Sequence, residues 1–385
     1  MTEETRLLHV GTAERRLHRT VAPPVQRGST VLMARAAELY DDDLVTYGRQ
    51  GLAAQEALIE GLCALEGATS VCLYPSGLAA LTGAMLALLE AGDEVAVCDT
   101  IYKPTRRFCD RVLERYGVKV VYYDPLWSPE EILARTGPRL RLVVLESPGS
   151  LSFEMQDMAA LASAARARGA LTLADNTWGA GYYCKPLELG VDVSVQALTK
   201  YVGGHSDAFM GSAAARDPAV GRRLADGVLN MGWAVGAEDA YLMLRGLRTL
   251  PTRLARHQSG ALKLASWLQD QPLVRQILHP ALPTHAGHEL WRRQFTGSCG
   301  LFGFTLAPDC APRVEAFLDA LELFGLGFSW GGFESLAISC DPQLRARTYR
   351  ADYGGPLIRL HIGLEDPDDL VADLARGFAV LSAAD

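Results

Sequence analysis

Short apolar segments alternate with helical segments through the first half of the chain, and this alternation constrains the fold most. Residues 94–98 and 118–123 are typical of buried strands, and a helical period over 104–116 separates them. Further strands are expected at 71–74, 140–145, 171–174 and 191–195, with a helix over 76–89. Parallel strands need helical crossovers. The order therefore predicts an α/β fold with a large, mainly parallel sheet and helices on both faces.

The pattern changes after about residue 240. A helical region interrupted at Pro251 is expected over residues 238–271. Two amphipathic helices are expected over residues 312–322 and 367–382, and two strands over residues 301–306 and 357–362. We therefore predict two domains: a large one over residues 51–245 and a smaller C-terminal α/β domain over residues 246–385.

The first 50 residues look irregular. They contain Pro23-Pro24 and the acidic run Asp41-Asp42-Asp43, and a helical period begins only at Ala53. A segment of this kind rarely folds alone, so residues 1–50 are expected to form an arm that lies against another surface.

Charge and composition narrow the function classes. The chain has 385 residues with 37 Lys+Arg against 45 Asp+Glu, a formal net charge of −8, and it contains no Lys/Arg run of the kind that binds phosphate backbones. This balance argues against nucleic-acid binding. Lysine-dependent chemistry has few candidate positions, because the lysines are Lys103, Lys119, Lys185, Lys200 and Lys263.

The sequence favours a reduced, cytoplasmic protein. The cysteines form no CxxC pair, the N-terminus has no apolar signal region, and no apolar run is long enough to cross a membrane. No metal site is expected, because Pro280 and Pro283 break the helix that a metal site at His279, His285 and His288 would use. Gly204–Ala208 resembles a nucleophile elbow but has Ala in place of the final Gly.

Lys200 and Asp175 form the most informative pair. Each follows an expected strand, at the sheet edge where ligands of open α/β sheets bind. A lysine and an acid at that edge suit pyridoxal 5'-phosphate (PLP): the lysine amine forms a Schiff base, and the carboxylate keeps the ring nitrogen protonated. Taken alone, a surface lysine and a strand-end aspartate are the more common explanation for either residue.

Three further features add to this pair. Ser76 is an expected N-cap, and Gly77 permits close backbone approach at a helix N-terminus, which favours an anion such as a phosphate. Tyr102 follows another strand and could stack on a planar cofactor. Arg359 lies inside an apolar strand, where a substrate carboxylate or an internal salt bridge would pair with it.

Over about residues 9–379 the chain resembles the PLP-dependent enzymes of cysteine and methionine metabolism, which have fold type I. The segments that carry the resemblance are Tyr47–Gly51, Tyr74–Ala80, Leu145–Ser150, Ala174–Trp178, Gln196–Tyr201, Phe328–Gly332 and Ile358–Glu365. The sequence Glu-Ser-Pro-Gly-Ser at 146–150 favours the β-lyase branch, since other branches usually have Glu-Thr-Pro-x-Asn-Pro there.

The resemblance implies roles for individual residues. Lys200 would be the Schiff-base lysine, Asp175 the partner of the pyridine nitrogen and Tyr102 the ring-stacking tyrosine, and these three are the expected catalytic residues. Gly77, Leu78 and Thr199 resemble the phosphate cradle. The expected cofactor-binding residues are therefore Lys200, Tyr102, Asp175, Gly77, Leu78, Thr199, Tyr47 and Arg49.

The resemblance also implies an assembly. Tyr47 and Arg49 match residues that reach the phosphate of a neighbouring subunit, which would make the arm part of an active site shared within a homotetramer. The expected substrate-binding residues are Arg359, which would bind the α-carboxylate, together with Ser329, Trp330 and Tyr47.

Two positions depart from the family pattern. Ala197 stands where many members have a phosphate-binding serine, and some β-lyases share this alanine. Phe328 stands where β-lyases commonly have tyrosine, and the missing hydroxyl bears on substrate preference.

The activity implied is cleavage of L-cystathionine to homocysteine, pyruvate and ammonia in methionine biosynthesis. A lyase for cysteine, cystine or other cysteine S-conjugates is the alternative enzyme, and γ-elimination ranks lower. A PLP-fold regulatory protein without catalysis, or a scaffold that binds no cofactor, would be alternatives of another class, since a fold does not fix a function.

Overall fold

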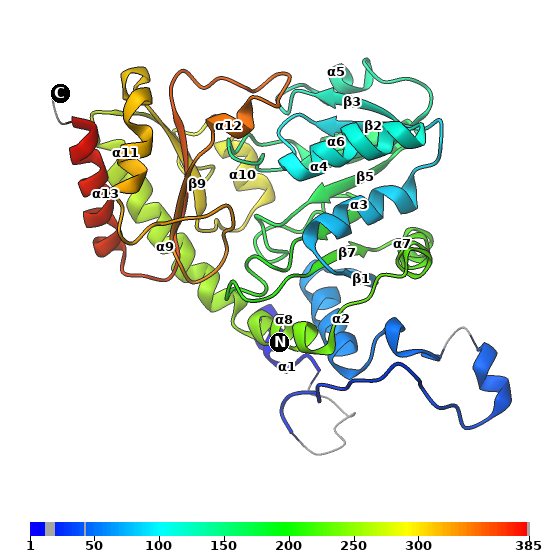
Figure 1. The fold of residues 1–385 in the computed structure, drawn as a ribbon. Coiled ribbons are helices and arrows are strands. Elements are labelled where there is room, and N and C mark those ends of the chain that lie inside the picture. Colours follow the sequence, from blue (N-terminus) through cyan, green and yellow to red (C-terminus); the bar gives the residue numbers. More distant parts are fainter. Residues whose placement is uncertain (12–19, 42–43, 383–385) are drawn as a thin grey trace.

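The computed structural model describes residues 1–11, 20–41 and 44–382. Its larger sheet has seven strands in the order β1-β7-β6-β5-β4-β2-β3 (Figure 1). Neighbours from β6 to β3 are parallel, and β7 is antiparallel to both β1 and β6. The expected mainly parallel sheet is therefore confirmed. The strands are β1 Ser70–Tyr74, β2 Glu94–Cys98, β3 Lys119–Tyr123, β4 Leu140–Glu146, β5 Leu171–Asp175, β6 Val193–Gln196 and β7 Gly211–Ala215.

Helices cover both faces of this sheet, as expected. The chain moves one way across the sheet through α3 and α4 and returns through α5 and α6. Right-handed crossovers therefore place these two pairs on opposite faces. The helices of this part are α2 Ala53–Glu66, α3 Gly77–Leu88, α4 Lys103–Phe108, α5 Pro129–Leu133, α6 Met158–Ala167, α7 Pro218–Met231 and α8 Ala237–Arg248. The helix predicted over 104–116 begins as α4 and continues as a π turn and a 3-10 turn to Tyr116.

A second sheet has the order β10-β11-β12-β9-β8. It is antiparallel except for the β10–β11 pair. A separate apolar core lies between this sheet and helices α9, α11 and α13. Its elements are β8 Val274–Leu278, β9 Leu301–Leu306, β10 Gly325–Leu326, β11 Leu336–Ser339, β12 Leu357–His361, α9 Leu250–Gln269, α10 His288–Gln294, α11 Val314–Asp319, α12 Asp341–Leu344 and α13 Pro367–Ser382.

The interruption predicted at Pro251 lies between α8 and α9, with Pro251 in the first turn of α9. Residue 245, where we expect a domain boundary, lies within α8, and the boundary itself stays a prediction.

The N-terminal segment is only partly irregular. Helix α1, Glu3–His9, is capped by Thr2 and buries Leu7, so the expectation of irregular structure is wrong there. Its acidic first turn is tied to the body by an ion pair between Glu3 and Lys185. Residues 20–41 and 44–50 extend away from both sheets (Figure 1). Of the acidic run, Asp42 and Asp43 lie outside the described residues.

None of the helices described is both long and apolar enough to cross a bilayer. The eight cysteines are all free thiols.

Candidate active site

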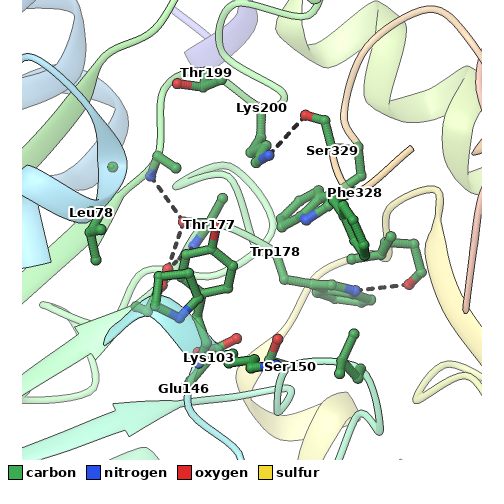
Figure 2. Close-up of a pocket in the computed structure, with 18 of the residues that line it drawn as sticks. Leu78, Lys103, Glu146, Ser150, Thr177, Trp178, Thr199, Lys200, Phe328 and Ser329 are labelled. Carbon is green, nitrogen blue, oxygen red and sulfur yellow. Dashed lines mark hydrogen bonds between the residues drawn. The ribbon is translucent and has the colours of Figure 1, made fainter. Parts of the chain in front are cut away.

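The carboxyl ends of the parallel strands meet at one edge of the larger sheet, next to the second sheet. A cavity of about 560 Å³ opens there (Figure 2). It is lined by all the predicted site residues except Tyr47 and Arg49, namely Gly77, Leu78, Tyr102, Asp175, Thr199, Lys200, Ser329, Trp330 and Arg359. The parallel register explains this convergence, because each strand delivers its following loop to the same edge.

Lys200 reaches into this cavity from the loop after β6. Its Nζ donates a hydrogen bond to Ser329 Oγ at 2.9 Å and lies 5.4 Å from the centre of the Trp330 ring. The pKa of Lys200 is lowered from 10.5 to about 8, chiefly by burial and also by the charge of Arg359, while the charge of Asp175 opposes both. About a tenth of the amine is therefore neutral at pH 7, far more than at the ordinary pKa of 10.5, and this neutral form can accept a proton.

Asp175 ends β5 and points its carboxylate at the same space. Thr177 donates to Oδ1 from its backbone N–H at 3.0 Å and from its hydroxyl at 2.6 Å. The same Thr177 hydroxyl oxygen accepts the Ala197 N–H at 2.9 Å. This chain of contacts fixes Asp175 relative to the loop that carries Lys200. Burial raises the pKa of Asp175, and the Thr177 hydrogen bonds and the Lys200 charge oppose that rise.

Glu146 is a cavity residue to which the sequence analysis assigned no role. It ends β4 directly beside Asp175, and its Oε2 accepts the Tyr102 N–H at 2.7 Å. Burial raises the pKa of Glu146 well above its usual range, with Asp175 adding to the rise. The contact fixes the backbone of Tyr102, whose ring is 44% exposed. The register between β4 and β5 is the signal that identifies Glu146, because this register places Glu146 opposite Asp175.

The start of α3 forms an anion site. Ser76 Oγ accepts the Ala79 N–H at 3.1 Å, which caps the helix. The first N–H groups of the helix, at Gly77 and Leu78, have no intrahelical acceptor and border the cavity. A Cβ on Gly77 would lie 2.3 Å from that of Ala197, so only glycine allows this close approach. Thr199 also lines the cavity, with its hydroxyl bonded to the backbone of Met210.

Arg359 enters from β12 of the second sheet. Its Nη2 donates to the carbonyl oxygens of Phe328 and Ser329, each at 3.1 Å. Its Nε is buried and has no hydrogen-bond partner among the described residues. A buried guanidinium with an unpaired N–H is suited to bind a carboxylate. Phe328 also borders the cavity, and its side chain is 76% exposed.

Tyr47 and Arg49 lie outside this cavity. Tyr47 is 48% exposed on the extended segment, and Arg49 Nη1 donates to the Leu229 carbonyl at 3.2 Å. The residues of the nucleophile-elbow and histidine motifs form hydrogen bonds outside the cavity. Ser206 donates a hydrogen bond to Glu334. Hydrogen bonds to nearby backbone groups are formed by His279, His285 and His288.

Comparison with known proteins matches this arrangement to a family. The family model described as Cys/Met metabolism PLP-dependent enzyme matches residues 4–379. A cystathionine beta-lyase from Bordetella avium is 42% identical over 97% of this chain and 96% of its own length. Cystathionine beta-lyase MetC from Escherichia coli is 40% identical, with 98% of each chain covered.

The fold has solved counterparts. The crystal structure of metB from Corynebacterium glutamicum superposes with a TM-score of 0.93 at 29% identity, covering 99% of this chain and 98% of that one. The expected architecture, a large sheet domain with a smaller α/β part, is thereby confirmed.

Proposed function

The chain belongs to the Cys/Met metabolism family of PLP-dependent enzymes, and from this we propose that it is a carbon–sulfur β-lyase that cleaves L-cystathionine to homocysteine, pyruvate and ammonia. The names of the relatives from Bordetella avium and Escherichia coli support this substrate. The observation that carries the proposal is the Lys200 amine, of lowered pKa, in one cavity with Asp175 and Arg359.

The residues of the cavity fit PLP. Asp175 offers a buried carboxylate to the protonated ring nitrogen, Tyr102 offers an aromatic face, and Gly77 and Leu78 offer unpaired N–H groups to the phosphate. The contact of Gly77 with Ala197 leaves the helix start open, because no Cβ fills it. Thr199 is the further candidate for phosphate binding. PLP, when bound, supplies an electron sink for the pair left when the α-proton of the substrate is removed.

The chain's own residues orient the substrate and move the proton. Arg359 binds the α-carboxylate through its unpaired Nε, which fixes the amino acid beside Lys200. Lys200 Nζ then accepts the α-proton, as its pKa of about 8 allows. Ser329 positions the amine through the 2.9 Å hydrogen bond, and Trp330 packs beside it. The bond from the β-carbon to sulfur breaks as the thiol of homocysteine leaves.

We also propose that the enzyme acts as a cytoplasmic homotetramer in methionine biosynthesis, with active sites shared between subunits. The extended segment supports this assembly, because it exposes Leu32 and Tyr40 by about nine tenths and carries Tyr47 and Arg49 away from their own cavity. In a neighbour's site Tyr47 and Arg49 would complete the phosphate and substrate contacts.

The test compares wild-type protein with Lys200→Ala on L-cystathionine, L-cystine and L-cysteine. We expect wild type to release pyruvate fastest from L-cystathionine, and the variant to lose both the visible absorbance of the bound cofactor and turnover. If only L-cystine or L-cysteine gave pyruvate, that compound and not L-cystathionine would be the substrate. Bound PLP without any pyruvate would favour the regulatory alternative. Turnover that survived in the variant would remove Lys200 from its role.

A further inference from the structure

The segment that carries Ser329 has no regular secondary structure of its own. Residues 327–335 connect β10 to β11, and only their contacts with other elements hold them. One of its three glycines, Gly331, has a φ of +84° and packs directly on the backbone of Lys200, where a Cβ would lie 2.8 Å from the Lys200 carbonyl carbon. The position of this segment therefore sets the position of Ser329 relative to the Lys200 amine.

Two residues of β12 hold residues 328–332 of this segment by hydrogen bonds. Arg359 and His361 are two positions apart, so their side chains leave the same face of the strand. Arg359 donates to the carbonyls of Phe328 and Ser329, and His361 Nε2 accepts the Gly331 N–H at 3.0 Å. His361 Nε2 also lies 3.2 Å from the Gly332 carbonyl oxygen.

The two anchors differ in their relation to the substrate. Arg359 lines the cavity and, under the proposed function, binds the substrate carboxylate with the guanidinium that also holds the segment. His361 is fully buried, bonds the segment and does not line the cavity. It is therefore the anchor whose contact is independent of the substrate.

We propose that His361 is a positioning residue: by accepting the Gly331 N–H it holds residues 328–332 in place and so keeps Ser329 Oγ at the Lys200 amine. This role deepens the proposed function. Only its expected effect on turnover rests on that function, and the contact between His361 and the segment does not.

The surroundings of His361 set the form of its ring. Burial lowers the pKa of His361 well below its usual range, and His257 adds to this, so the ring is neutral. Nε2 can accept the Gly331 N–H only with the proton on Nδ1, whereas it could donate to the Gly332 carbonyl only with the proton on Nε2. We assign the first form to the ring. The titratable and charged groups near the ring are Tyr201, His257, Arg359 and Lys200, from the Lys200 loop, α9 and β12.

A matched pair of variants isolates the contact. In His361→Gln the side-chain oxygen can occupy the place of Nε2, whereas in His361→Asn it falls at the place of Nδ1, which makes no hydrogen bond among the described residues. His257→Gln is the control, because His257 is equally buried in the same ring cluster but bonds the Ile362 carbonyl.

The primary readout is hydrogen exchange of the Gly331 amide in the full-length holoenzyme. We expect His361→Asn to raise this exchange by about five- to tenfold, as loss of one hydrogen bond implies, to shift the pH midpoint of the cofactor's visible absorbance, and to lower kcat more than it raises KM. His361→Gln should restore most of each value, and His257→Gln should change none of them. Unchanged exchange in His361→Asn, or an equal effect of His257→Gln, would overturn the proposal.

A measurement on the wild type covers the case in which His361→Asn does not fold. In histidine-labelled protein, the nitrogen chemical shifts of His361 should report a protonated Nδ1 and an unprotonated Nε2. A proton on Nε2 would overturn the proposal. Both readouts are independent of turnover, so a protein that released no pyruvate would contradict the proposed function and leave this inference standing.

Discussion

At the scale of single residues, burial decides the chemistry of the site. It is the largest cause of the lowered pKa of Lys200, about 8, which lets the amine act as a base. Burial also raises the pKa of Asp175, and the Thr177 hydrogen bonds and the Lys200 charge oppose that rise and so favour the carboxylate that would pair with a cation. The scarcity of lysine in the sequence limits such chemistry to five positions, all described by the structure, of which Lys103 and Lys200 line the cavity. The physical basis for the reactivity of Lys200 is its position in a part-closed cavity beside Arg359.

The lowered pKa of Lys200 is testable by chemical modification. In protein freed of cofactor, the rate of Lys200 acylation should rise with pH to a midpoint near 8, because only the neutral amine reacts. Mass spectrometry of digests measures this rate, and the other four lysines serve as internal references for the reagent. A Lys200 midpoint near the ordinary value of 10.5 would contradict the electrostatic account.

Arg359 should matter through its geometry as well as its charge. Arg359→Lys keeps the positive charge but loses the planar pair of donors that suits a carboxylate. We expect kcat/KM for L-cystathionine to fall by about 10- to 100-fold, the equivalent of one or two charge-assisted hydrogen bonds. Steady-state kinetics measure the change. A value within twofold of wild type would show that another group binds the carboxylate.

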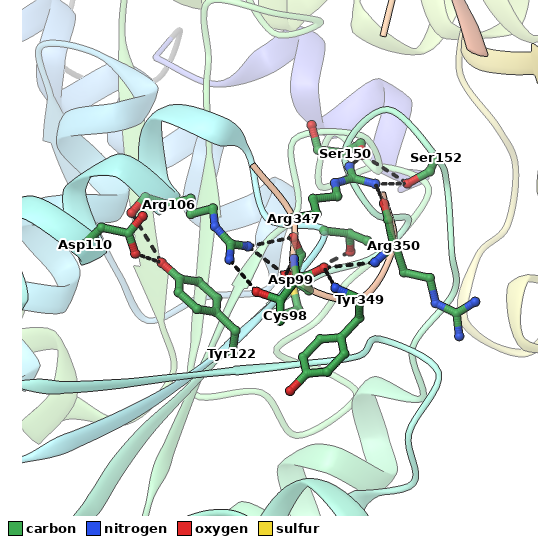
Figure 3. A network of polar contacts seen from close by, with 12 residues as sticks. Cys98, Asp99, Arg106, Asp110, Tyr122, Ser150, Ser152, Arg347, Tyr349 and Arg350 are labelled. Atoms are coloured by element: carbon green, nitrogen blue, oxygen red, sulfur yellow. Dashed lines mark hydrogen bonds and ion pairs between the residues drawn. The ribbon is translucent and has the colours of Figure 1, made fainter. Parts of the chain in front are cut away.

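At the scale of elements, a carboxylate clamp holds the two sheets' loops together at the site (Figure 3). The Asp99 carboxylate accepts hydrogen bonds from the backbone N–H groups of residues 348, 349 and 350 at 2.8 to 3.1 Å. It also forms an ion pair with the Arg106 guanidinium at 2.7 Å. Asp99 lies three residues before Tyr102. The clamp therefore ties the tyrosine's loop to the segment between β11 and β12.

Removal of the clamp's charge should destabilise the fold. Asp99→Asn leaves the largely buried Arg106 without its anion, at an expected cost of about 3 kcal/mol in the free energy of unfolding. Denaturant titration measures it. Asp226→Asn, which removes an exposed carboxylate from α7, is the control and should cost much less. Equal stabilities of Asp99→Asn and wild type would contradict the role of the clamp.

The contribution of Asp99 should depend on pH in a defined direction. Burial raises its pKa, but the three N–H groups and Arg106 outweigh burial and lower it overall. A lowered folded-state pKa means that the stabilisation is present above the unfolded value of about 3.9 and is lost as pH falls through the folded value. The stability difference between wild type and Asp99→Asn should therefore be constant from pH 6 to 8 and shrink below about pH 4.

The start of α3 should tolerate no side chain at its first residue. Gly77→Ala brings a Cβ within 2.3 Å of Ala197, so the helix start must move away from the cavity. We expect cofactor affinity, measured by reconstitution of the cofactor-free protein, to fall by about tenfold or more, since phosphate contacts are distance-sensitive. Ala79→Gly, in the same turn, should lower stability with little change in affinity. Unchanged affinity in Gly77→Ala would place the phosphate elsewhere.

The elements that could be predicted from the sequence are those whose hydrophobic pattern reflects their burial in the fold. Buried parallel strands such as β2 and β4 have continuous apolar runs, at residues 95–98 and 142–145, and these runs predict the strands. Strand β7 was missed because it reads Gly-Ser-Ala-Ala-Ala, small residues of low strand propensity. It needs them, since a Cβ on Gly211 would lie 2.3 Å from the Ser76 carbonyl oxygen.

The same distinction holds within the site. Lys200, Asp175 and Gly77 follow strands and could be predicted from their position in the alternation. Glu146 also follows an expected strand, but its contacts with Asp175 and Tyr102 could not be predicted, and neither could the contact of His361. These contacts depend on which strand lies beside β4 and on which loop lies over β12. Such relations arise from tertiary packing and leave no local pattern.

At the scale of the whole molecule, we propose that the extended segment completes the active site of a neighbouring subunit. Mixed assemblies test this. Lys200→Ala and Arg49→Ala subunits should each be poorly active alone. Unfolded and refolded together, they should regain about a quarter of wild-type activity, because mixed dimers contain one intact shared site. Size-exclusion chromatography checks that tetramers form. No recovery in mixed tetramers would mean that Arg49 serves its own chain.

The position of the broken bond tests the central proposal most directly. Wild-type holoenzyme with L-cystathionine should release pyruvate and homocysteine in equal amounts, because Lys200 removes the α-proton and sulfur leaves the β-carbon. Pyruvate, 2-oxobutyrate and both thiols are quantified from one reaction. Release of 2-oxobutyrate with cysteine in place of pyruvate with homocysteine would show cleavage at the γ-carbon and contradict the account.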